Sequence, residues 1–195
     1  MNQEEKLKEF SNILIEETDT FYKWSEGVIR ISGDILELIA HKVEKKCGRS
    51  SLLESGSHKP GKDQEVYGES VSSKSAKLEG NDFKISSYRL TTCETIEDFI
   101  YEIKKRDESF TKYLVCLTEV LENKHIVRWG FIDKSKTDIS GLEWKYKYGK
   151  TGRESALVTL DGKYQIKFSM SNQLWINLTI DDFDIICTYE YDLNK

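Results

Sequence analysis

Acidic, hydroxyl and ammonium side chains gather in one short segment of the chain. A two-residue hairpin turn at Gly68-Glu69, with glycine in the first central position, would place Asp63 opposite Lys74. Alternate side chains of a strand share a face, and residues on paired strands meet across it. One face of this predicted hairpin therefore carries four polar side chains, those of Asp63, Glu65, Ser72 and Lys74.

This group has the chemistry of a metal-dependent phosphodiesterase. Paired carboxylates with loop carbonyls bind a hard divalent cation such as Mg²⁺, which polarises a phosphodiester and acidifies a water. A nearby lysine positions that water or stabilises the charge that builds on phosphorus. The alternative is an exposed edge hairpin in which Asp63 and Lys74 form an ion pair worth less than about 1 kcal/mol. A one-residue slip in register would also turn Ser72 and Lys74 to the opposite face.

Hydrophobic periodicity predicts three helices, over residues 2–18, 34–47 and 94–108. Strands are predicted between and after them, over residues 63–78, 82–90, 113–121, 125–132, 143–148, 156–160, 164–168, 174–178 and 185–189. This order predicts an α+β (mixed α/β) fold, with one central mixed β-sheet flanked by helices. No repeat or linker divides the chain, so residues 1–195 are expected to form a single domain.

Three segments carry a resemblance to a known family. The first is Pro60-Gly61-Lys62-Asp63 with Ser72-Ser73-Lys74, the second is Lys74-Ser-Ala-Lys-Leu with Ile85-Ser-Ser-Tyr-Arg89, and the third is Ser169-Met-Ser-Asn-Gln-Leu-Trp-Ile176. On these motifs the chain resembles the PD-(D/E)xK nuclease superfamily, and within it the type II restriction endonucleases. The resemblance implies a restriction-endonuclease-like core with extra C-terminal strands. It also implies Mg²⁺ as cofactor, with Mn²⁺ as a substitute, and double-stranded DNA as substrate.

The resemblance assigns roles to individual residues. Asp63 would be the metal-binding aspartate and Lys74 the catalytic lysine. The second acid of the family stands at position 72, where this chain has Ser72. A carboxylate from elsewhere would then complete the site, either Glu65 on the same hairpin face or Glu37 in the preceding helix. Glu37 is alternatively a solvated helix residue, and the number of metal ions stays open.

Basic and uncharged polar residues beyond the hairpin are candidates for DNA contact. Residues 134–153 carry six Lys or Arg and two acids, and cationic side chains contact phosphates or read guanine. The predicted DNA-binding residues are Arg89, Lys145, Lys147, Lys150, Arg153, Ser171, Asn172 and Gln173. A surface strand end, an amphipathic strand and a hairpin loop are the structural alternatives for these segments.

Taken alone, the net charge of −5 speaks against a nucleic-acid partner, but this charge is unevenly distributed along the chain. Residues 1–20 carry six acids and two lysines, and residues 181–195 carry five acids and one lysine, so each end contributes −4. The span 21–180, which holds every motif above, is therefore +3. The acidic total is a property of the two ends and does not count against DNA.

Composition and the resemblance also predict the cellular compartment and the oligomeric state of the protein. No apolar run approaches the roughly 20 residues of a membrane span, and the N-terminus lacks the pattern of a signal peptide. Four scattered cysteines without a CxxC motif suit a reducing cytoplasm, which the resemblance implies is prokaryotic. A palindromic target would match a homodimer. The alternatives are a repair or junction-resolving nuclease of the same superfamily, and a non-catalytic DNA-binding or regulatory protein.

Overall fold

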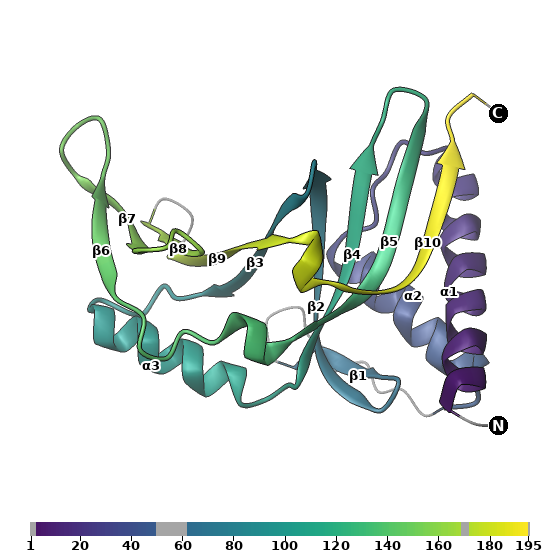
Figure 1. The fold of residues 1–195 in the computed structure, drawn as a ribbon, viewed down its shortest axis with the longest axis horizontal. Coiled ribbons are helices and arrows are strands. Elements are labelled where there is room, and N and C mark those ends of the chain that lie inside the picture. Colours follow the sequence, from purple (N-terminus) through teal and green to yellow (C-terminus); the bar gives the residue numbers. More distant parts are fainter. Residues whose placement is uncertain (1–2, 50–61, 169–171, 195) are drawn as a thin grey trace.

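A computed structural model describes residues 3–49, 62–168 and 172–194. Within them the chain forms three α-helices and a ten-stranded mixed sheet (Figure 1). The helices are α1 (Gln3–Ser25), α2 (Gly33–Lys46) and α3 (Ile96–Asp107). The strands are β1 (Gln64–Val66), β2 (Glu69–Glu79), β3 (Asp82–Arg89), β4 (Lys112–Val120), β5 (Lys124–Asp133), β6 (Trp144–Tyr148), β7 (Glu154–Thr159), β8 (Tyr164–Lys167), β9 (Gln173–Thr179) and β10 (Asp184–Asp192). The predicted α+β class with a central mixed sheet is confirmed.

Strand β2 is the junction of the sheet, whose order is β10-β5-β4-β2-β3-β9-β8-β7-β6. Along one edge β2 pairs in parallel with β4, which follows the crossover helix α3. Along its other edge it pairs with β1 through residues 69–71 and with β3 through residues 78–79. Among the described residues, positions 72–77 of β2 have no strand partner on that second edge.

Different helices cover the two faces of the sheet. Helices α1 and α2 pack behind β4, β5 and β10, where Phe10 and Leu36 share a hydrophobic cluster with Trp129 (Figure 1). Helix α3 contributes Phe99 and Ile103 to a second cluster, which it shares with β3, β8 and β9. Side chains of β2 alternate between the two clusters because successive residues of a strand face opposite ways.

Helix α1 is longer than the sequence predicted, ending at Ser25 instead of near residue 18. The polar Thr18 does not end it, because its hydroxyl donates to the carbonyl of Leu14 and accepts from Trp129 Nε1. The next turn buries Tyr22 completely, with its ring centroid 5.4 Å from that of Tyr191 in β10. Tertiary contacts therefore continue the helix beyond the polar residue at which the sequence predicted that it would end.

The four cysteines are free thiols, three of them buried and Cys47 half-buried. In the part of the chain that the structure describes, no helix has the length and apolar character needed to cross a membrane.

Candidate active site

The β1–β2 hairpin turns one residue earlier than the sequence suggested. Val66 pairs with Glu69 and Gln64 with Val71, so the turn residues are Tyr67 and Gly68. Both have positive φ, of 54° and 77°, as a two-residue hairpin turn of this hand requires. The expected turn at Gly68-Glu69 and the pairing of Asp63 with Lys74 were therefore wrong. Because the register differs by two residues, side chains keep the faces predicted for them.

Contacts with α2 explain why a tyrosine occupies the left-handed turn position. The main-chain N–H of Tyr67 donates to Glu44 Oε1 at 2.9 Å, and the Arg49 guanidinium lies 5.2 Å from the Tyr67 ring centroid. Glu44 is buried and also accepts from Arg49 Nε at 2.6 Å. Helix α2 thus holds the hairpin through one of its own buried carboxylates.

Asp63, Ser72 and Lys74 meet on the unpaired edge of β2. Asp63 Oδ2 accepts hydrogen bonds from the main-chain N–H of Ser73 and from Ser72 Oγ, the latter at 3.2 Å. Nζ of Lys74 lies 3.7 Å from Asp63 Oδ2, and donates to Ser72 Oγ at 2.8 Å and to the Ser73 carbonyl at 3.0 Å. The open edge exposes the Ser73 peptide groups that bind both charged side chains.

Glu37 on α2 lies close enough to interact electrostatically with Asp63 and Lys74, whereas Glu65 pairs with Lys62. The carboxyl of Glu37 has its pKa raised to about 7 by burial, then by the negative charges of Asp63 and Asp34, with Lys74 opposing. Glu37 is two turns before Glu44, so both face the hairpin. The Glu65 side chain is 57% exposed and bound to Lys62 Nζ at 2.8 Å. Glu37 is therefore the stronger candidate for a second acid.

Burial also changes the pKa of the lysine in the site. It lowers the pKa of Lys74, although the negative charges of Asp63 and Glu37 oppose this change by stabilising the ammonium. An amine with a depressed pKa exchanges a proton more readily near neutral pH than an exposed lysine does. The site therefore pairs a carboxyl that holds its proton unusually tightly with an amine that holds its proton unusually loosely.

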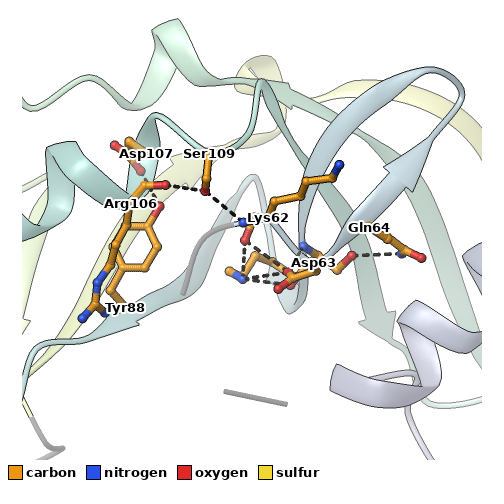
Figure 2. Close-up of polar contacts among 10 residues, drawn as sticks. Lys62, Asp63, Gln64, Tyr88, Arg106, Asp107 and Ser109 are labelled. Atoms are coloured by element: carbon orange, nitrogen blue, oxygen red, sulfur yellow. Dashed lines mark hydrogen bonds and ion pairs between the residues drawn. The ribbon is translucent and has the colours of Figure 1, made fainter. Parts of the chain in front are cut away.

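The C-terminal end of α3 fixes the start of β1 (Figure 2). Ser109 Oγ accepts from the main-chain N–H of Lys62 at 3.0 Å and donates to the Arg106 carbonyl at 2.7 Å. Beside it, Tyr88 donates its hydroxyl to the buried carboxylate of Asp107, and the Arg106 guanidinium lies 5.5 Å from the Tyr88 ring centroid. This network ties the residue before Asp63 to the crossover helix.

The donor atoms of the site suit a hard cation. Glu37 and Asp63 supply carboxylate oxygens, and Ser73 supplies a carbonyl oxygen on the same edge. The negative charge of Asp63 raises the pKa of Glu37, and a divalent cation between the two carboxylates would relieve that repulsion. No group of three or more His, Cys, Asp or Glu suited to a metal occurs in residues 3–49, 62–168 and 172–194. Mg²⁺ needs only one or two carboxylates, because it keeps several waters and takes substrate phosphates as ligands.

A second polar surface covers the part of the sheet from β3 to β6, on the side away from α3. Two cross-strand rows of side chains lie on it. The first row is Ser86, Trp175, Gln165, Val158 and Lys145, and the second row is Arg89, Gln173, Lys167, Ala156 and Lys147. Neither row contains an acid. We call this surface the polar face.

The polar face unites four of the predicted DNA-binding residues, namely Arg89, Lys145, Lys147 and Gln173. It adds residues that sequence reasoning missed: Gln165, Lys167 and Trp175. The alternation of polar with buried apolar residues in β3, β8 and β9 was the available signal. It assigns a face to each side chain, but only the order of strands brings these faces together.

The other predicted DNA-binding residues lie elsewhere. Lys150 and Arg153 are exposed in the β6–β7 turn, beyond both rows. Asn172 adopts φ 51°, and its carboxamide donates to the Leu90 carbonyl at 3.3 Å, so it holds β9 against the end of β3. Ser171 lies outside the described residues.

A hollow of about 640 Å³ joins the open edge of β2 to the polar face. Ser75 and Lys77 line it from β2, Lys84 and Ser86 from β3, and Trp175 from β9. Arg30, in the segment between α1 and α2, also lines it, as do the acids Glu79 and Asp82. The polar face is therefore continuous with residues 75–77 of the edge that also carries Lys74.

Comparisons of the chain with models of protein families, with curated proteins and with solved structures give no match.

Proposed function

We propose that this protein is a Mg²⁺-dependent endonuclease that hydrolyses phosphodiester bonds of double-stranded DNA, of the PD-(D/E)xK type. The observation that carries the proposal is the contact of Asp63 with Lys74 at the unpaired edge of β2, with Glu37 near enough for its charge to act on Lys74. Supporting it is the order α2-β1-β2-β3-α3-β4, in which a crossover helix returns the chain to β2.

Each residue of the site has a part in the proposed reaction. Asp63, Glu37 and the Ser73 carbonyl would hold Mg²⁺, with Mn²⁺ as a substitute. The metal when bound polarises the phosphodiester and lowers the pKa of a water. Lys74 orients the attacking water or stabilises charge on phosphorus. Ser72, between Asp63 and Lys74, keeps the carboxylate and the amine apart by bonding to both.

The polar face supplies the surface for the duplex. Its cations neutralise phosphates, and its uncharged polar side chains suit base edges. The hollow beside β2 leads from this surface to the catalytic edge. We infer site-specific cutting by a homodimer on a palindromic target, as in a type II restriction enzyme of a prokaryotic cytoplasm.

A digest of mixed-sequence plasmid DNA tests the activity. With Mg²⁺, discrete fragments are the expected result, and smearing would instead favour a repair or junction-resolving nuclease of the same superfamily. Sedimentation of the protein with a two-fold symmetric duplex tests the dimer. Absence of cutting with Mg²⁺ or Mn²⁺ across unmodified DNA of varied sequence would overturn the proposal.

Ser72 favours a second candidate, a non-catalytic DNA-binding or regulatory protein on the same scaffold. The position that would carry the second acid is a serine whose hydroxyl is already bonded to Asp63 and Lys74. A protein of this kind would bind duplex DNA with Ca²⁺ or without metal and never cut it. The plasmid digest separates the two candidates directly.

A further inference from the structure

Most of the positive charge in the two rows of the polar face lies at their ends. Lys145 and Lys147 stand on β6 at one end, and Arg89 stands on β3 at the other. The middle of the first row is Trp175 and Gln165, and the middle of the second row holds Gln173 beside Lys167. Lys167 Nζ lies 4.8 Å from the Trp175 ring centroid, so its charge sits on an aromatic face. Cations therefore stand at both ends of the second row and at the β6 end of the first, and the one charge in the middle is that of Lys167.

The rows are wider than a groove of duplex DNA, so only their middle can enter one. Four strand spacings of about 4.8 Å separate β3 from β6, a span of roughly 19 Å. The major groove is about 12 Å wide and admits a two-stranded β-ribbon, which is the size of the β8–β9 pair that carries Gln165 and Gln173. Cations at the two ends therefore come over the two phosphate backbones, while the middle of each row comes over base edges.

Two carboxamides occupy that middle. Gln165 and Gln173 are half-buried, and neither makes a side-chain hydrogen bond within the described residues. They lie on adjacent strands and are diagonal neighbours, since Gln165 pairs with Trp175, two residues along β9 from Gln173. Diagonal neighbours are about 7–8 Å apart, close to two base steps of 3.4 Å.

We propose that Gln165 and Gln173 determine the target sequence, each by selecting an adenine in the major groove. This inference rests on the proposed function. A glutamine carboxamide has a donor and an acceptor side by side, which match adenine N7 and N6–H₂. The target should then hold two A·T pairs about two base steps apart.

Selection from a pool of duplexes with a randomised 12-base-pair centre tests this in Ca²⁺, without cutting. The wild-type chain should enrich a motif with two A·T pairs in that spacing. Gln165→Ala should lose about 5- to 150-fold preference at one of them. Gln165→Glu should select cytosine there, because a carboxylate accepts from cytosine N4. Gln173→Ala should affect the other pair, and Lys145→Ala should weaken binding to all duplexes alike.

The inference is overturned if the enriched motif lacks A·T pairs, or if both Gln165 variants keep the wild-type motif. A parallel digest of the selected duplex with Mg²⁺ separates this failure from that of the proposed function. If the wild type cuts and the Gln165 variants select the wild-type motif, the base-reading role is refuted and the nuclease proposal stands. If the motif depends on the glutamines but the protein never cuts, the base-reading role stands and the nuclease proposal is refuted. A chain that binds no duplex loses both.

Discussion

The carboxylate of Asp63 lies 3.7 Å from Nζ of Lys74, across an edge of β2 that no strand of residues 3–49, 62–168 or 172–194 covers. The two side chains approach each other through the peptide of Ser73, whose N–H binds the acid and whose carbonyl binds the lysine. A strand partner at this point would take up both peptide groups. The site therefore forms because β1 and β3 diverge from β2 and leave the peptide groups of Ser73 available to these two side chains.

Replacement of Lys74 tests the chemistry of the site. We expect Lys74→Ala to lower the rate of cutting by about 10²- to 10⁴-fold while DNA binding in Ca²⁺ persists, because the lysine acts on the reacting phosphate. Single-turnover cleavage and fluorescence anisotropy measure the two effects. Lys124→Ala, at the start of β5, where the lysine pairs with Glu190, is the matched control and should cut normally. Equal loss of binding and cutting would contradict a role in chemistry.

The raised pKa of Glu37 makes stability depend on pH. Its folded-state value of about 7 exceeds the usual 4.5, so the folded chain holds a proton that the unfolded chain releases between these values. Stability from this group is full below about pH 4.5 and is lost as pH rises through about 7. Without metal, Glu37→Gln should therefore be more stable than wild type by roughly 2 kcal/mol at pH 8, and nearly equal at pH 4.5. Urea unfolding at both pH values measures this, and a gain that is independent of pH would refute it.

Ser72 and Glu37 should differ in their effect on metal dependence. Ser72→Ala removes a hydroxyl but leaves both carboxylates, so we expect about a tenfold loss of cutting with an unchanged Mg²⁺ requirement. Glu37→Gln would remove one proposed metal ligand, so it should abolish the stabilisation by added Mg²⁺ that we expect of the wild type at pH 8. Thermal melting against Mg²⁺ concentration measures the stabilisation of each variant by the metal, and cleavage rates at several Mg²⁺ concentrations measure the loss of cutting and its metal requirement. Glu65→Gln is the control, since Glu65 is bonded to Lys62, and it should respond to Mg²⁺ as the wild type does.

The cations at the β6 end of the polar face should bind phosphates without reading sequence. Lys145→Ala and Lys147→Ala are each expected to weaken duplex binding uniformly, and to reduce the slope of log K against log salt by about 1. Anisotropy titrations between 50 and 200 mM salt would give the slopes. If the slope of either variant equals that of wild type, the side chain does not contact phosphate.

Ser109 is expected to position Asp63 through Lys62. Ser109→Ala breaks both hydrogen bonds that join the start of β1 to the end of α3, so we expect about a tenfold fall in cutting. The apparent affinity for Mg²⁺ should fall with it, because the aspartate is less well held. Ser109→Thr keeps the hydroxyl and should restore both values. Failure of the threonine variant to restore them would argue against this hydrogen-bond route.

The sequence by itself determined the α+β class, the three helices and the faces of Asp63, Ser72 and Lys74, because periodicity assigns each residue a side. It could not determine the hairpin register, since a turn at Gly68-Glu69 and one at Tyr67-Gly68 satisfy the same alternation. Contacts of Tyr67 with Glu44 and Arg49 decide between them. These partners lie 23 and 18 positions away, beyond any local pattern.

Tertiary structure likewise decided which acid joins Asp63. Glu65 is two residues from it and turns to Lys62, whereas Glu37 is 26 residues away and comes to it on α2. The polar face is a product of strand order, which sets β3 beside β9 although β3 ends at Arg89 and β9 begins at Gln173. Period and spacing give each side chain a direction, and only packing between distant segments determines what it meets there.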